Sequence, residues 1–181
     1  MATPSSSQAV PEQLPETAAH AQLAKLYAAH GREVLAYALR RARTPEDGAD
    51  AVAETFLVAW RRLRDVPAEP ESRLWLYGVA RRALANQRRG ADRQDRLAER
   101  LRAEARVALE ATPPQDRNET VLTALAALSP DDRELLLLIG WEELTPVEAA
   151  RVLGISAVAA RVRLHRARRR LDEELGGSTG D

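Results

Sequence analysis

The residues best suited to binding a partner are arginines near the C-terminal end of the sequence, within residues 156–171. If this segment is a helix, one side carries only apolar residues, which can pack against a core: Ala160, Leu164, Ala167 and Leu171. We predict that the other positions contact DNA: Ser156, Val158, Arg161, Val162, Arg163, His165, Arg166 and Arg169. One guanidinium group can donate two hydrogen bonds to a guanine edge or bind a phosphate, so a rigid cationic helix suits the major groove.

The residues before this segment carry the signals of a short helix and a tight turn. Thr145 and Glu148 have the spacing of a capping box, and Pro146 suits a first helical position. Gly154 can take the left-handed conformation that ends such a helix, and Ser156 can cap the next one. Together these signals predict a helix-turn-helix. The alternative, a solvated arginine-rich helix end, explains residues 168–170 equally well, because cations complement the C-terminal dipole.

The chain has no net charge, but its charges are unevenly distributed. Residues 67–90 contain five Arg and two Glu, and residues 151–181 contain seven Arg and four acids. Between them, residues 121–150 contain one Arg and six acids. Local charge decides where phosphates can bind, so the first two stretches are candidate nucleic-acid surfaces.

Composition excludes several classes of protein. The sequence has 34 Ala, 25 Leu and 26 Arg but only 14 Val and Ile together, which favours helices over a large sheet. It has no cysteine, so disulfides, thiolate catalysis and Cys-based zinc sites are excluded. His20, His30 and His165 are scattered, and no metal, cofactor or catalytic motif accompanies them. We therefore expect a cytoplasmic protein that is not an enzyme, binds no cofactor and has no membrane span.

Periodicity and turn signals predict an all-α fold of two small helical domains. The first, residues 19–90, has helices at about 21–43, 45–63 and 72–89, and the last of these ends near Gly90. The second is residues 120–175, in which Ser129-Pro130 begins a helix that Gly140 ends. We expect residues 91–119 to form a flexible charged linker, residues 1–18 a disordered tail and residues 176–181 a short tail.

The predicted helix at 45–63 has a clear polar face opposite its apolar stripe. This face carries Asp47, Asp50, Glu54 and Arg61, with the acids Asp50 and Glu54 one helical turn apart. Such a face can dock a partner protein, although an ordinary solvated face would have the same pattern.

Three motifs resemble extracytoplasmic-function sigma factors of bacterial RNA polymerase. The string ALSPDDRELLLLIGWEELTPVEAARVLGISAVAARVRLHRARRRL, with RLHRAR at Arg163–Arg168, resembles their C-terminal DNA-binding region. DAVAETFLVAWRRL, Asp50–Leu63, resembles their second conserved region, and RLWLYGVARRALANQRR, Arg73–Arg89, their promoter-melting region. The resemblance covers about residues 20–90 and 120–173. It implies a factor that binds core RNA polymerase and directs it to specific promoters.

The resemblance assigns roles to the candidate residues. The face with Asp47, Asp50, Glu54 and Arg61 would bind the polymerase, although the family usually has Gln at Ala53 and often Asn at Arg82. The opened minus-ten element would contact Arg73, Arg81, Arg82, Asn86, Arg88 and Arg89, and a flipped base would enter the loop at 65–72. The helix 156–171 would read the minus-thirty-five element. Core polymerase and promoter DNA are the implied partners, and an anti-sigma factor is a further candidate.

Some alternatives remain open at this stage. Trp75 suits the core better than base stacking, whereas Tyr77 suits either role. Val158 and Val162 suit thymine methyl contacts or simple exposure. A helix-turn-helix regulator without polymerase docking would need an effector pocket or a dimer seam, and a protein-only adaptor would leave the cationic helix unexplained. Forming a stable complex with core polymerase separates a sigma factor from both.

Overall fold

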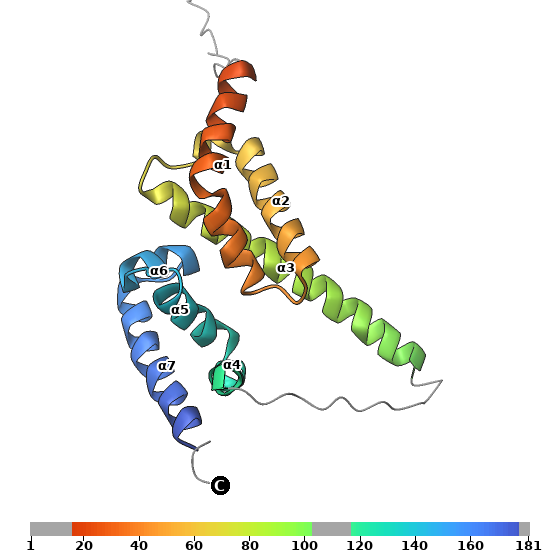
Figure 1. Cartoon of the computed structure of the whole chain (residues 1–181), viewed down its shortest axis with the longest axis vertical. Helices are drawn as coiled ribbons and strands as arrows, with labels where there is room; N and C mark the ends of the chain where they lie inside the picture. The colour runs from red at the N-terminus through yellow and green to blue at the C-terminus, as the bar shows by residue number, and fades with distance from the viewer. Residues whose placement is uncertain (1–15, 103–116, 178–181) are drawn as a thin grey trace, which may run out of the picture.

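The computed structural model describes residues 16–102 and 117–177, and within these ranges all regular structure is helical (Figure 1). The elements are α1 (Glu16–Leu39), α2 (Pro45–Arg61), η1 (Leu63–Asp65), α3 (Glu71–Arg102), α4 (Arg117–Ala127), α5 (Pro130–Gly140), α6 (Pro146–Leu153) and α7 (Ala157–Gly177). The all-α prediction is therefore confirmed. No described helix is long and apolar enough to cross a membrane.

Helices α1, α2 and α3 pack on one another and form what we call the N-terminal module. Phe56 and Ala59 of α2 and Val34 and Ala38 of α1 are buried in its core. The start of α2 packs closely on the end of α1, since a Cβ on Gly48 would lie 2.8 Å from Leu39 Cδ2 and 3.4 Å from Leu39 Cα. Burial on both sides of α3 makes this helix the support for the others.

The ends of three helices differ from the sequence-based predictions, and one of them is α7, which runs to Gly177 rather than Leu171. Helix α1 begins at Glu16, inside the predicted tail, and ends at Leu39 rather than Arg43. Helix α3 runs through Gly90 to Arg102, inside the predicted linker. Gly90 does not take the positive φ of a stop signal, so with no proline nearby the backbone ladder continues. Parts of three predicted segments lie outside the described residues: 1–15 of the tail predicted at 1–18, 103–116 of the linker predicted at 91–119, and 178–181 of the short tail predicted at 176–181.

Helices α4 to α7 form the C-terminal module, in which side-chain caps begin α5, α6 and α7. The Ser129 side chain accepts a hydrogen bond from Asp132 N at 3.2 Å, where α5 begins. Leu135 and Leu138 of α5 are fully buried. Each predicted cap in this module is present, since Thr145 begins α6 and Gly154 ends it.

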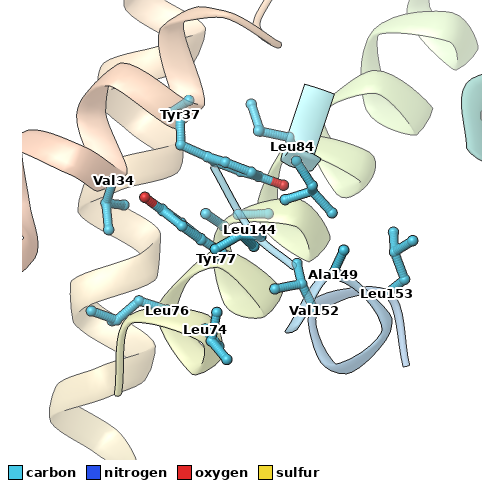
Figure 2. Close-up of a cluster of buried hydrophobic side chains, with 14 of the residues drawn as sticks. Val34, Tyr37, Leu74, Leu76, Tyr77, Leu84, Leu144, Ala149, Val152 and Leu153 are labelled. Carbon is cyan, nitrogen blue, oxygen red and sulfur yellow. The ribbon is translucent and has the colours of Figure 1, made fainter. Parts of the chain in front are cut away.

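The two modules lie against each other in the described structure, with α3 of one touching α6 of the other. Leu144 and Val152 of the C-terminal module pack with Tyr77 and Leu84 of α3 in one buried cluster (Figure 2). Helix α6 lies against α3 at Gly78, where a Cβ would make an ordinary van der Waals contact, 3.7 Å from the Val152 carbonyl oxygen.

Candidate nucleic-acid interfaces

The helix-turn-helix formed by α6 and α7 has the expected local chemistry. Thr145 and Glu148 form a reciprocal capping box, with Thr145 N donating to Glu148 Oε2 at 2.8 Å. Hydrogen bonds from the Thr145 hydroxyl and backbone hold the pKa of Glu148 below its usual range. Gly154 ends α6 with φ of 69°, and Ser156 Oγ accepts from Ala159 N at 3.1 Å where α7 begins. These contacts fix the angle at which α7 leaves the turn.

The outer face of α7 is open to a ligand. Ala160, Leu164 and Ala167 are buried, as predicted, which leaves the opposite side in solvent. Val158 is 67% exposed and Val162 45% exposed. Three cationic or polar side chains on this side are exposed and pair with no acid in the described part of the chain: Arg161, His165 and Arg166.

Arg163 and Arg169 differ from the other predicted contacts on α7. Arg163 Nη1 lies 3.2 Å from Asp131 Oδ2, so it faces α5 rather than free solvent. Arg169 Nε pairs with Glu173 one turn along the same helix, at 3.2 Å. Asp132, which is buried, accepts a hydrogen bond from Arg170 Nη1 at 2.7 Å. The Arg163 side chain therefore holds α5 against α7 in addition to any contact with DNA.

The polar face predicted on α2 is present in the structure. Gly48, Ala51, Thr55, Phe56 and Ala59 are buried on one side, and Asp50, Glu54 and Arg61 are exposed on the other. Asp47 is half-buried at the start of the helix, where its backbone N–H donates to Thr44 Oγ1 at 3.1 Å. This face is therefore available to a partner protein.

The six predicted minus-ten residues fall on two strips of α3 rather than one. Arg81 and Arg88 lie on the strip that faces the C-terminal module, where Arg81 Nη2 is 3.3 Å from Asp131 Oδ1. Arg73, which begins the same side, lies 3.9 Å from Glu33. Arg73 and Arg81 therefore lie near carboxylates, and Arg88 lies beside the contact between the modules.

Arg82, Asn86 and Arg89 form the second strip, about 100° around the helix from the first. All three are exposed, and Arg89 donates a hydrogen bond to the side-chain oxygen Oδ1 of Asn86. Only this strip is open along its whole length to a nucleic-acid strand.

The contact between the modules includes a buried ionic network. Arg41 Nε donates to Glu134 Oε2 and Arg41 Nη1 to Glu142 Oε1, both at 2.8 Å. Tyr37 Oη donates to Glu134 Oε1 at 2.7 Å, and Arg40 donates to Glu142. The side chains of Arg41 and Glu142 are only 6% and 3% exposed, so this ion pair is shielded from solvent.

Two tyrosines stack beneath that network. The Tyr37 and Tyr77 ring centroids are 4.8 Å apart with an interplanar angle of 18°, and the rings lie face to face in Figure 2. Burial, with Glu134 nearby, raises the pKa of Tyr37 well above its usual value. Burial, with Glu142 and Glu33, raises the pKa of Tyr77 to about 12. Tyr77 is 2% exposed, so it is a core residue here and is not available to stack on a base.

A cleft of about 270 Å³ lies between α1 and the loop before α3. At one end of this cleft, the ring of buried His30 on α1 contacts the loop: His30 Nε2 is 2.6 Å from Glu69 Oε1 and 3.1 Å from Ser72 Oγ. The residues lining the cleft are Gln22, Lys25, Leu26, Ala29, Leu63, Val66, Pro67, Ala68, Glu69 and Ser72.

Sequence reasoning missed the roles of His30, Tyr37, Arg41 and Glu142. Their partners lie 39 or more positions away in sequence, and no helical periodicity reports contacts at that distance. A signal was available only for Glu142, an acid that lies three residues after the apolar run 135–139.

Comparisons with known proteins agree with this arrangement. The family model described as Sigma-70 region 2 matches residues 26–94, and that described as Sigma-70, region 4 matches residues 118–171. RNA polymerase sigma factor CarQ of Myxococcus xanthus is 32% identical over 158 residues, covering 83% of this chain and 87% of CarQ. RNA polymerase sigma factor YlaC of Bacillus subtilis is 28% identical over 156 residues, covering 83% of this chain and 90% of YlaC.

Solved structures show the same fold. CnrH, in complex with the cytosolic domain of CnrY, superposes with a TM-score of 0.63 and 26% identity over 90% of this chain and 94% of CnrH. The sigma factor RpoE of Bartonella quintana, in complex with the anti-sigma factor NepR, gives a TM-score of 0.60 at 23% identity, covering 89% of this chain and 96% of RpoE. With both conserved regions present in order, the chain belongs to the sigma-70 family, as an RNA polymerase sigma factor of the extracytoplasmic-function type that directs promoter-specific transcription.

Proposed function

We propose that three separate surfaces of this chain carry its work as a sigma factor. The acidic face of α2 docks on core polymerase, the exposed strip of α3 holds the opened minus-ten strand, and α7 reads the minus-thirty-five element. The chain itself catalyses no reaction and acts in the cytoplasm. The sequence-based module limits, residues 19–90 and 120–175, remain part of this proposal.

The observation that supports the minus-thirty-five role most strongly is the open face of α7. A capped helix whose buried side packs on α5 and α6 presents Arg161 in its second turn, where a recognition helix meets base edges. Arg166 lies one turn further on and Arg169 beyond it, where phosphates are the expected partners. Reading and clamping would then be divided along one helix.

For the minus-ten role we propose Arg82, Asn86 and Arg89 as the main contacts. Their side chains are exposed on one strip of α3, so a single strand can follow them without displacing protein. Asn86 can hydrogen-bond a base, while the two arginines contact phosphates. The cleft beside the 66–70 loop is the proposed site of a flipped base.

Both promoter elements cannot be bound in the closed arrangement described here. Elements centred at minus ten and minus thirty-five are 25 base pairs apart, roughly 85 Å at about 3.4 Å per base pair. In the closed form the two modules touch, with Arg151 Nη1 3.1 Å from Glu71 Oε1. The modules therefore separate when the chain binds a promoter. RpoE of Bartonella quintana is bound to the anti-sigma factor NepR, and we propose an anti-sigma factor as a candidate partner of the closed form.

The docking assignment is tested by reversing charge on α2. The double variant Asp50→Lys with Glu54→Lys should weaken binding to core polymerase, measured by fluorescence anisotropy of labelled protein, without change in helical content. The matched control, Asp172→Lys with Glu174→Lys, makes the same charge change at exposed positions of α7. Equal affinity of both double variants would exclude the α2 face, since one exposed charge contributes only about 0–1 kcal/mol but two reversals add repulsion.

A further inference from the structure

We propose that His30 is a positioning residue for promoter recognition: it fixes the carboxylate of Glu69 at the mouth of the cleft beside the 66–70 loop. This inference rests on the proposed minus-ten role of the N-terminal module. It goes further by naming the acceptor that meets the flipped base and the buried residue that holds this acceptor in place. His30 itself touches no nucleic acid.

The geometry of His30 is unusual for a core residue. The residue is 8% exposed, yet its ring points from α1 toward a loop carboxylate that is itself 61% exposed. A carboxylate only accepts hydrogen bonds, so Nε2 carries the proton and donates to Glu69 Oε1 at 2.6 Å. The other ring nitrogen, Nδ1, lies 3.5 Å from Glu33 Oε2 on the same helix.

Apart from Val66, which packs against the buried cluster, the described contacts that position the loop are few. Its described backbone hydrogen bonds are local: Asp65 N donates to Arg62 O at 2.8 Å, and Glu71 N to Ala68 O at 3.1 Å. Pro67 and Pro70 have no N–H to donate. Among described residues, the hydrogen bond from His30 to Glu69 is therefore the side-chain bond that ties this loop to α1.

Glu69 is held in the form that can accept a hydrogen bond from a base. Hydrogen bonds from Ser72 and then from His30 lower the pKa of the Glu69 carboxyl, so it stays ionised. Glu69 and Ser72 both line the cleft of about 270 Å³, whose other walls are largely apolar, such as Leu26, Val66 and Pro67. Apolar walls with one fixed acceptor match a flat base that carries an exocyclic amino group, as cytosine, adenine and guanine do and thymine does not.

The test is transcription by reconstituted holoenzyme from a promoter panel in which each non-template minus-ten base is changed in turn. For wild type we expect one position at which a base with an exocyclic amino group is preferred over thymine. In His30→Ala this preference should fall about tenfold, the loss expected for one good base contact. His30→Gln, whose amide can donate to Glu69, should restore part of it. The preference for minus-thirty-five variants should be unchanged in all cases.

Two further variants keep the outcome decisive. Glu69→Gln changes only an exposed side chain, and it should remove the same base preference without changing the melting temperature. Arg32→Ala, an exposed change on α1, is the matched control and should change nothing. If Glu69→Gln keeps the base preference, or if His30→Ala lowers transcription equally from every promoter, the inference is wrong. If the wild type itself responds to no minus-ten change, the proposed function of the module is wrong instead.

Discussion

The two modules are built on different principles. Helices of the N-terminal module are long, and its core contains large aromatic side chains such as Phe56 and Tyr77. In the C-terminal module α4, α5 and α6 have only 11, 11 and 8 residues, and α5 and α6 begin at a side-chain cap with proline in the first turn, as α2 alone does among the helices α1 to α3 with a described cap. Packing between long helices is therefore more prominent in the first module, and helix caps are more prominent in the second. The same difference decides how each module should respond to mutation.

The largest effect is expected where the modules meet. Glu142→Ala removes a buried carboxylate that pairs with Arg41, and losing one partner of a buried pair costs about 3–5 kcal/mol. Because the modules can separate and solvate Arg41, the expected result is separation, seen as a larger radius of gyration by small-angle X-ray scattering. The control Glu71→Ala breaks the exposed pair with Arg151, worth about 0–1 kcal/mol, and should leave the radius unchanged. An equal response to both changes would contradict the buried network.

The next largest effect is expected from core truncations, which should show that the two modules differ in stability. Leu76→Ala in α3 and Leu138→Ala in α5 each remove a fully buried side chain and should cost about 2–5 kcal/mol. The smaller module has less buried surface to lose, so Leu138→Ala should unfold it while the N-terminal module persists. Urea unfolding of variants that retain only Trp141, or only Trp60 and Trp75, reports each module by itself. Coincident transitions from both probes would show one cooperative unit.

A smaller effect is expected from the helix caps. Thr145→Ala should cost about 1 kcal/mol and more than Thr44→Ala, because Thr145 has a reciprocal box and Thr44 accepts a single bond. The pKa of Glu148 is lowered in the folded protein, so its stabilisation is present above the unfolded pKa and is lost as pH falls. The Thr145→Ala cost should therefore shrink in acid, measured by thermal unfolding from pH 7 downward. A cost independent of pH would exclude the Glu148 contribution.

The same contrast explains what the sequence could predict. In the C-terminal module, Ser129, Thr145 and Gly154 marked helix ends correctly, because caps act within three or four residues. In the N-terminal module the ends of α1 and α3 were predicted wrongly. For α3 the reason is Gly90, which suggested a helix end although its backbone does not take the positive φ of such an end. The apolar stripe predicted for α2 was only partly right: Phe56 is buried, but Ala49 and Ala53 are exposed and the buried side is formed largely by Gly48, Ala51, Thr55 and Ala59.

The candidate sites divide in the same way. The open face of α7 follows from helical spacing alone, so it was predictable. That Arg81 would face Asp131, and Arg82 would not, depends on where another module lies. His30 gave no signal, because its partner Glu69 is 39 positions away on an irregular loop. Contacts between residues far apart in the sequence depend on the fold, so local sequence patterns could not predict them.

We expect each module to read a different promoter element, and a transcription experiment can separate the two roles. Holoenzymes with Arg161→Ala or Asn86→Ala are compared on promoters changed at either the minus-thirty-five or the minus-ten element. Arg161→Ala should cost about 1–3 kcal/mol and relax preference only at one or two minus-thirty-five base pairs. Asn86→Ala should relax preference only in the minus-ten element, and Arg169→Ala should weaken all promoters alike with a salt slope lower by about one. If either of the first two variants relaxes preference at both elements, or at neither, the division of reading between the modules is contradicted.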